Sequence, residues 1–426
     1  MLGALKLSLY SCPGPIIDDF RDPSTGCGTG DLNEWRLAHG MGRIEGDKMI
    51  EQHVQIDEER QRQARRYARI RRRLLVLDLA LGGLYLIVLL VSGASAQLEA
   101  ALWQVSTHPL WLVGAYVTLV LGVYGLALLP FSFYSSYILP HRFGLSTQTV
   151  RGWIADQIKG AAVGGLLGLA LIEATYALLR AAPATWWLWA GVGYLFFTVI
   201  MANLAPVLLV PLFFKLTPIA DQDLAARLTR LAERAGTHVR GVFTVDLSRR
   251  TKAANAALMG LGNTRRIVLG DTLLRKFTSD EIETVLAHEL GHHVHRDIPL
   301  LIASQSILTL GGLYLAHRVL TSAATAFGFR GPDDIAAFPL FMLTLGAFSL
   351  VTMPLANALS RWRERLADEY ALAASGKPLA FASALTRLAN QNLAEVDPEP
   401  WVVWLLYDHP PLGQRIAAAR KAAGGG

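Results

Sequence analysis

The chain has 426 residues, 52% of them hydrophobic and only 17% charged, with a mean hydropathy of +0.33. Ordinary soluble domains contain fewer apolar and more charged residues, so a large soluble enzyme is not expected. The net charge of +6 does not indicate a nucleic-acid partner, because the basic residues gather before one hydrophobic run and form no groove with interleaved aromatic residues.

Residues 1–54 form an N-terminal extension that is rich in Gly, Asp and Pro and has no sustained period. We expect this segment to be disordered, or translation to begin at Met49 rather than at Met1. It contains both cysteines of the chain, Cys12 and Cys27, so the main body offers no disulfide framework and no thiolate metal ligand. Any metal bound there must be held by His, Asp or Glu.

Six runs are apolar and long enough to cross a hydrocarbon core of roughly 30 Å at about 1.5 Å per helical residue. A buried core helix of a soluble enzyme could explain one such run but not six, so the pattern predicts a multi-pass membrane protein. Pro206 and Pro211 are expected to kink or end the fourth run, whose tail could lie at the interface. The runs are 74–96, 110–130, 158–179, 186–214, 299–320 and 336–359.

Eight arginines lie between Arg60 and Arg73, directly before the first run. By the positive-inside rule this end of the run is cytoplasmic. Counting crossings divides the chain into a membrane region (55–215), a cytoplasmic catalytic region (216–298), two further spans (299–359) and a cytoplasmic tail (360–426). We expect an integral membrane protein whose active site faces the cytoplasm, in the inner (plasma) membrane if the host is bacterial.

The composition turns polar between the fourth and fifth runs. Leu224, Leu228 and Leu231 recur at helical spacing, in a segment that ends near Gly236. One strand is predicted at 239–246, and two more on either side of a glycine-rich turn at 260–264. Thr278 and Glu281 then form a capping box, which predicts the start of the next helix.

That helix carries the sequence His288-Glu289-Leu290-Gly291-His292. Residues four apart share a helical face, so both imidazoles can reach one ion. Glu289 is placed to hold a water beside the ion rather than to bind the ion itself. Zinc lowers the pKa of such a water toward about 7 and polarises the scissile carbonyl, while the glutamate takes the proton. The alternative is a solvated helix with spare histidines.

Three further polar residues follow the motif. His293 points off the ligand face and is expected to be a neighbour of the site rather than a ligand. His295 returns to roughly the same side as His288, yet it too is interpreted as a neighbour. Asp297 is interpreted only as a polar helix end before Pro299.

A catalytic zinc needs a third protein ligand and an open fourth position. After the sixth run, Asn357, Arg361, Glu364 and Asp368 recur at helical spacing and share one face. Combined with the two histidines, Glu364 completes a His-His-Glu set, and Asp368 suits a hydrogen bond to the free nitrogen of a ligand histidine. The alternative is an ordinary amphipathic stop, in which arginines of this segment anchor lipid headgroups.

These residues resemble the M48 family of zinc metallopeptidases, in particular its integral-membrane CAAX prenyl proteases of the Ste24 type. The match runs from about Arg65 to Ile416, and the four predicted spans before the motif favour this branch over the shorter HtpX-type proteases. Beside the His-Glu-Leu-Gly-His motif, the matching elements are the loop Leu129–Gly160; Asn255-Ala256 before the strand Arg266–Leu269; Asn357, Ser360, Arg361, Glu364 and Asp368; and His409, Pro410 and Arg415.

The resemblance implies that Glu364 is the third zinc ligand and Glu289 the general base. It also implies that His409 and Arg415 line the site and steady the oxyanion or the substrate backbone, while the Asn255-Ala256 strand receives the substrate as an added antiparallel strand. The family enzymes have seven spans around a water-filled chamber, whereas six are predicted here. Unless the N-terminal extension supplies another helix, we expect the chamber to open on one side or to be sealed by lipid.

We therefore expect a mainly α-helical integral membrane protein with about six transmembrane helices and a cytoplasmic zincin-like α+β metallopeptidase domain, built from the motif helix and a small antiparallel sheet. The predicted activity is that of a zinc metalloendopeptidase with one Zn²⁺ per chain, acting on peptides or membrane proteins, including ones with a lipidated C-terminus. Its partners are this substrate and the lipid bilayer, without nucleic acid. CAAX-protease-like processing and membrane-protein quality control are both open as its role. The alternative is a zinc-containing transporter or structural membrane protein without proteolytic activity.

Overall fold

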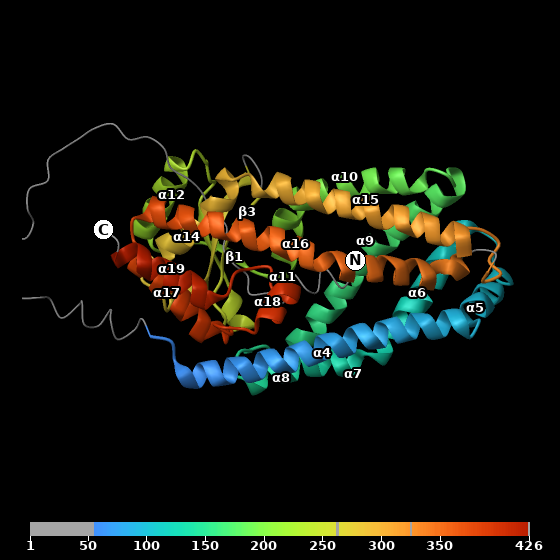
Figure 1. The fold of residues 1–426 in the computed structure, drawn as a ribbon, viewed down its shortest axis with the longest axis horizontal. Helices are drawn as coiled ribbons and strands as arrows, with labels where there is room; N and C mark the ends of the chain where they lie inside the picture. Colours follow the sequence, from blue (N-terminus) through green and yellow to red (C-terminus); the bar gives the residue numbers. More distant parts are fainter. Residues whose placement is uncertain (1–54, 261–263, 324–325, 425–426) are drawn as a thin grey trace, which may run out of the picture.

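A computed structural model of the protein describes residues 55–260, 264–323 and 326–424. The N-terminal extension predicted for residues 1–54, with both cysteines, lies outside the described residues. The described part is elongated: long apolar helices fill one end, and a lobe of shorter helices and a small sheet forms the other (Figure 1).

Six helices are long and apolar enough to cross a membrane, which confirms the six predicted spans. The first predicted run was too long, because the helix ends at Val91 and Gly93 adopts a left-handed conformation with φ 73° before a separate helix, α5 (Ala94–Trp103), begins. The six are α4 (Glu58–Val91), α6 (Pro109–Ala127), α9 (Val150–Ala181), α10 (Trp186–Leu204) with its continuation to Phe213, α15 (Asp297–Ala323) and α16 (Phe338–Ser375).

The fourth span changes its winding where the prolines occur. Helix α10 passes at Ala205 into a π-helical turn, η2 (Ala205–Leu209), and then into the short α11 (Val210–Phe213). Pro206 lies in the π turn and lacks the backbone N–H that regular helical bonding would need, so the helix rewinds there. A similar π turn, η1 (Tyr134–Ile138), lies between α7 (Leu129–Phe133) and α8 (Leu139–Arg142).

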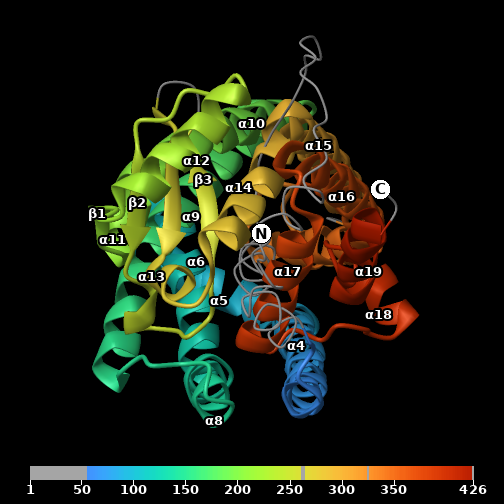
Figure 2. The same ribbon diagram turned by 90° about the vertical axis from the view of Figure 1, so that its left-hand side faces the viewer.

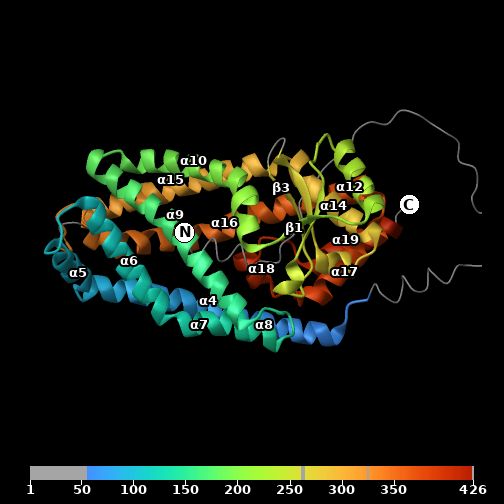
Figure 3. The same ribbon diagram turned by 180° about the vertical axis from the view of Figure 1, so that it is seen from behind.

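The membrane helices pack most tightly at the end farthest from the lobe. Large side chains there, among them Tyr116, Trp186 and Phe338, are fully buried in one apolar cluster. Ser95 of α5 joins the cluster to the turn before α16, since its hydroxyl lies 2.6 Å from the Tyr116 hydroxyl and donates to the carbonyl of Ala336 at 2.6 Å. From behind, α9 crosses obliquely from the α10 side of the bundle to α7 and α8 (Figure 3).

The lobe contains a four-stranded sheet in the order β1-β2-β4-β3. The predicted antiparallel sheet is in fact mixed, because β2 and β4 run parallel while both outer pairs are antiparallel. After β2 the chain first forms β3 at one edge of the sheet and then turns back to form β4 between β2 and β3. Strand β1 was not predicted. The strands are β1 (Leu216–Pro218), β2 (Val242–Val245), β3 (Ala256–Met259) and β4 (Arg266–Gly270).

Seen from the lobe end, the sheet lies on one side of α14, and α16, α17 and α19 lie on the other (Figure 2). The apolar stripe predicted between 224 and 231 packs into this core, where Leu228 and Leu231 are buried with Ile267, Leu269 and Phe381. The lobe helices are α12 (Gln222–Arg234), α13 (Asp271–Leu274), α14 (Ser279–Val294), α17 (Pro378–Asn392), α18 (Pro400–Leu406) and α19 (Leu412–Gly424).

The arginine-rich start of α4 extends beyond the apolar part of that helix and docks on the lobe. The Gln61 amide donates to the carbonyl of Ala394 at 3.0 Å and accepts from the N–H of Val396 at 3.1 Å. Arg72 pairs with Glu395 at 2.8 Å. On the other side of the lobe, Arg250 forms a two-bond fork with Asp156 of α9, at 2.7 and 2.8 Å. The lobe is thereby fixed to two of the membrane helices.

The capping box of α14 is formed as predicted: Thr278 accepts from the N–H of Glu281 at 3.2 Å, and the Glu281 carboxylate accepts from the N–H of Thr278 at 2.7 Å. Replacing Thr278 by alanine removes one cap, which costs about 1 kcal/mol. We expect Thr278→Ala to speed amide hydrogen exchange in the first turn of α14 roughly fivefold, measured by mass spectrometry. Thr278→Ser keeps the hydroxyl and should exchange like the parent; equal exchange in all three proteins would contradict the role of the cap.

Candidate metal centre

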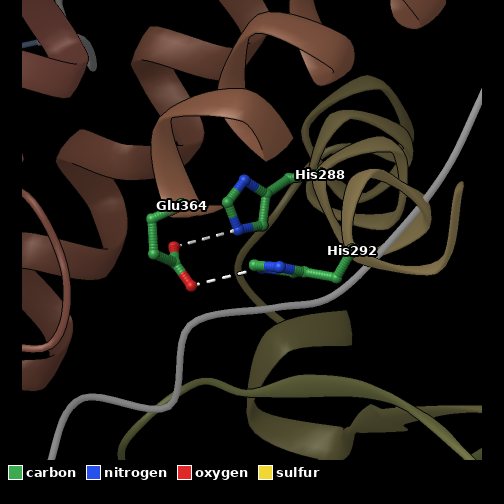
Figure 4. Close-up of side chains that lie close together, drawn as sticks. All are labelled: His288, His292 and Glu364. Carbon is green, nitrogen blue, oxygen red and sulfur yellow. Dashed lines mark ion pairs between the residues drawn. The ribbon is translucent and has the colours of Figure 1, made fainter. Parts of the chain in front are cut away.

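Helix α14 places three polar side chains in the interior of the lobe. His288, Glu289 and His292 are all buried, because the helix runs between the sheet and α16 and is covered on both sides. The two imidazoles, four residues apart, lie on the same face with ring centroids 5.2 Å apart and planes nearly perpendicular. Both rings point toward the carboxylate of Glu364 on α16 (Figure 4).

Glu364 lies where α16 leaves its apolar stretch and packs against α14. Its two oxygens face the two histidines separately, 3.4 Å from Nε2 of His288 and 3.2 Å from Nε2 of His292. The three candidate ligand atoms lie within 4.8 Å of one another. The residues expected from the sequence as ligands are thus brought together from two helices that are separated by two membrane crossings.

The donor set fits a metal ion. Nε2 of His288 and Oε2 of Glu364 are buried and meet no hydrogen-bond partner among the described residues. Buried polar atoms without a partner are rare and costly, and a cation between them would satisfy both. Two histidines and a glutamate are also a set that catalytic zinc sites use, with a further position open.

Glu289 is buried beside this group but is not part of it. Neither of its carboxylate oxygens meets a hydrogen-bond partner among the residues that the structure describes. Burial raises the pKa of Glu289 well above the usual value and the nearby charge of Glu364 raises it further, while the backbone N–H of Leu258 and the charge of Arg415 oppose the rise. A carboxyl group in this environment can both accept and return a proton.

Each of the two histidines has a carboxylate beside its Nδ1 atom. Nδ1 of His288 lies 2.7 Å from Asp368, which is where the helical spacing placed that residue. Nδ1 of His292 lies 2.5 Å from Asp297, which is 1% exposed. Asp297 was therefore misread as a mere helix end: it lies beyond a turn, where helical periodicity no longer reports which residues share a face. Its position five residues after His292, across a tight turn, was the available signal.

His409 and Arg415 both reach the group from the C-terminal segment. Nε2 of His409 lies 3.2 Å from Glu364, and its Nδ1 lies 2.7 Å from Asp408. Burial lowers the pKa of His409, but the charges and hydrogen bonds of Glu364 and Asp408 outweigh it and raise the pKa to about 10. Arg415 forms a fork with Asp368, at 2.8 and 2.6 Å, and its guanidinium also lies 3.3 Å from Nδ1 of His288.

Asn357 and Arg361 share the face of Glu364 and hydrogen-bond to backbone carbonyls of the C-terminal segment. Asn357 donates to the carbonyl of Leu405 at 2.8 Å, and Arg361 donates to those of Val403 at 3.0 Å and Tyr407 at 2.5 Å. These bonds fix the end of α18 and the chain that leads to His409. Their support of the site therefore goes through His409 rather than through hydrogen bonds to the ligand histidines.

Asn255 and Ala256 lie at the start of β3, the edge strand beside α14. The carbonyl of Asn255 accepts from the N–H of Gly270 at 2.8 Å, while its side-chain oxygen is buried without a partner among the described residues. Of the extra histidines, His293 lies 2.7 Å from Arg265, and burial together with the Arg265 charge lowers the pKa of His293 to about 4. His295 packs against Tyr370. Neither belongs to the ligand group.

Comparison with known proteins relates both halves of the chain to one group of proteases. Residues 218–423 match the family model described as peptidase family M48, and residues 48–215 match the model described as CAAX prenyl protease N-terminal, five membrane helices. The uncharacterized metalloprotease YhfN of Bacillus subtilis is 29% identical over 365 residues, which cover 84% of this chain and 85% of the relative.

Eukaryotic relatives match over a shorter range. The CAAX prenyl protease 1 homolog of Oryza sativa is 32% identical over 69% of this chain and 70% of its own length. CAAX prenyl protease 1 of Saccharomyces cerevisiae is 32% identical over 68% of each chain. The crystal structure of Ste24p from S. mikatae superposes with a TM-score of 0.77 at 24% identity, covering 90% of this chain and 93% of that one, so the two share a fold.

We expect the purified protein to retain about one Zn²⁺ per chain after dialysis, as a three-ligand catalytic site does. His292→Ala and Glu364→Ala each remove a ligand and should bring the zinc content close to zero, measured by inductively coupled plasma mass spectrometry. His295→Ala is the matched control and should keep the metal. Zinc retained by both ligand variants would place the metal elsewhere.

Proposed function

The chain belongs to peptidase family M48 and is a multi-pass membrane metallopeptidase, and from this premise we propose that it is a zinc endopeptidase with His288, His292 and Glu364 as ligands and Glu289 as general base. The observation that carries the proposal is the buried Glu289 carboxylate, which has no partner among the described residues and lies next to a convergent His-His-Glu group. A structural zinc site usually has four protein ligands and needs no such base.

A bound Zn²⁺ would supply Lewis-acid polarisation of the scissile carbonyl and a water of lowered pKa. Glu289 would accept a proton from the attacking water while the water oxygen adds to the carbonyl carbon. The C–N bond then breaks, and Glu289 returns the proton to the leaving nitrogen, so the carboxyl group ends in its starting state.

We assign to His409 the role of stabilising the negative charge that develops on the carbonyl oxygen. With its pKa near 10 it is cationic at neutral pH, and it is held beside Glu364 by Asp408. A fixed cationic donor at that place stabilises an oxyanion without having to reorganise. Arg415 holds Asp368 beside His288 and also contacts Nδ1 of His288 directly.

The substrate would pair with the edge of β3. Asn255 and Gly270 form a hydrogen-bonded pair of the β3–β4 ladder, so by antiparallel alternation Ala256 and Leu258 direct their N–H and C=O groups toward the other side, the edge of the sheet in the described residues. An extended peptide can add there as a further strand, which recognises the main chain and tolerates varied side chains.

The substrate class follows from the fold and the relatives. The site lies where α15 and α16 leave their apolar stretches, which favours peptides that approach from a membrane surface. Several relatives are named CAAX prenyl proteases, so we propose C-terminal, lipidated peptides as one class and membrane proteins under quality control as the other. The arginines before the first span support our proposal that the site faces the cytoplasm, in a bacterial host at the inner membrane.

Glu289→Gln should lower the rate of peptide cleavage by about 10²–10⁴-fold, because the amide cannot take the proton, while the zinc content stays unchanged. The measurement is cleavage of a quenched fluorescent peptide library by detergent-purified protein, with metal analysis of the same sample. Glu369→Gln, an exposed neighbour on α16, is the matched control and should cleave normally. Full activity of a clean Glu289→Gln preparation would exclude this base.

Leu258→Pro removes one N–H that is proposed to bind the substrate, and a proline is tolerated at an outward position of an edge strand. We expect the KM for a peptide substrate to rise about tenfold, the worth of one lost hydrogen bond, with a smaller change in kcat. Leu258→Ala keeps the N–H while it shortens the same side chain. A similar KM in both variants would argue against substrate addition to β3.

A further inference from the structure

The second histidine of the motif is held by a chain of contacts that the mechanism above does not use. Nδ1 of His292 lies 2.5 Å from one oxygen of Asp297, and the other oxygen of Asp297 accepts from the guanidinium of Arg363. Asp297 is 1% exposed and Arg363 is 7% exposed. The hydrogen bonds of this buried aspartate go to the candidate ligand histidine and to this arginine.

The arginine comes from the helix of the third ligand. Arg363 immediately precedes Glu364 on α16, so the contact that fixes Asp297 also sets the position of α16 against the end of α14. Arg363 donates a further bond, at 2.8 Å, to the carbonyl of His295, which lies in the turn after α14. One guanidinium therefore joins the end of the motif helix, the start of α15 and the helix that carries Glu364.

The turn between α14 and α15 is bent to make these contacts. Arg296 adopts a left-handed backbone conformation with φ 52°, which is unfavourable for a residue with a Cβ. This turn brings Asp297 back toward the helix it has just left, so its carboxylate reaches His292. Strained residues of this kind persist where surrounding contacts over-determine them, and here Arg363 bonds to the residues on both sides of Arg296.

We propose that Asp297 and Arg363 are positioning residues for the metal centre, forming a relay His292–Asp297–Arg363 that orients one ligand and couples it to the helix of another. The proposal rests on the proposed function, because it concerns how the ligands are held. A carboxylate that accepts from Nδ1–H of a ligand histidine fixes the tautomer, leaves the Nε2 lone pair directed at the ion, and raises the basicity of the ring.

The relay has a counterpart on the other ligand. His288 is held by Asp368, and Asp368 by Arg415 of α19, with the same order of histidine, carboxylate and arginine. The two relays use different residues, so they can be tested separately. Since α16 contributes both Arg363 and Asp368, it fixes the two histidines from either side of Glu364.

The test compares Asp297→Asn and Arg363→Gln with the parent protein in detergent. Zinc affinity is measured by competition with a chelator of known affinity, and ligand geometry by the visible spectrum of the Co²⁺-loaded protein. Loss of a partner of a ligand histidine is expected to weaken zinc binding by about 10–100-fold and to change the Co²⁺ spectrum, while excess zinc restores much of the activity.

The matched control is Asp334→Asn, which breaks another buried aspartate–arginine contact, with Arg330, at the far end of the membrane helices. It should lower thermal stability without changing zinc affinity. Unchanged zinc affinity and an unchanged Co²⁺ spectrum in folded Asp297→Asn would overturn the relay and leave the metallopeptidase proposal intact. A parent protein that binds no zinc would overturn both.

Should Asp297→Asn fail to fold, the same two measurements on Arg363→Lys and Arg363→Gln decide the question. A lysine keeps the charge but loses the forked donor that bonds both Asp297 and the carbonyl of His295. Weaker zinc binding in both variants supports the relay. Zinc affinity equal to that of the parent in both would overturn it.

Discussion

The arrangement of the metal centre depends on one packing constraint, which is the register of α16 against α14. Arg363, Glu364 and Asp368 span an arc of about 140° on α16, at about 100° per residue. A shift of one residue would turn the helix by about 100°, so Arg363 would take the place of Glu364 beside the two histidines. The same helix crosses the membrane, and its first turn is packed in the cluster around Phe338. The site is therefore built on α16, which is packed among membrane helices at its start and within the lobe at its end.

Much of this site could be predicted from the sequence because local rules govern it. Helical spacing put His288 and His292 on one face and Glu364 near Asp368, and the capping box gave the start of α14. Asp297 and Arg363 were missed because their contact crosses a turn and then a second helix, which no periodic pattern reports. The mixed sheet was missed for a related reason: strand direction depends on the crossover after β2, and strand composition says nothing about it.

The number of membrane helices was predicted correctly, but not all of their bounds, and single residues explain the differences. Hydropathy found six spans, yet it extended the first past Val91, because residues 92–96 are small and uncharged and do not end the apolar run. The family model of the N-terminal half is described as having five membrane helices, and between residues 55 and 215 the structure describes four helices of sufficient length. Helix α5 has 10 residues, about 15 Å, which is too short to cross.

The charges around the centre explain why the unpaired atoms are informative. Asp297, Asp368, Arg363 and Arg415 are buried or nearly so, and each meets an opposite charge, as buried ions must if the lobe is to fold. Against that background, Nε2 of His288, one oxygen of Glu364 and both oxygens of Glu289 meet no hydrogen-bond partner in the described part of the chain. A fold that satisfies its surrounding charges so fully would not leave four convergent polar atoms unmatched without a compensating ligand. We therefore propose that the metal and the substrate water bind at these four atoms.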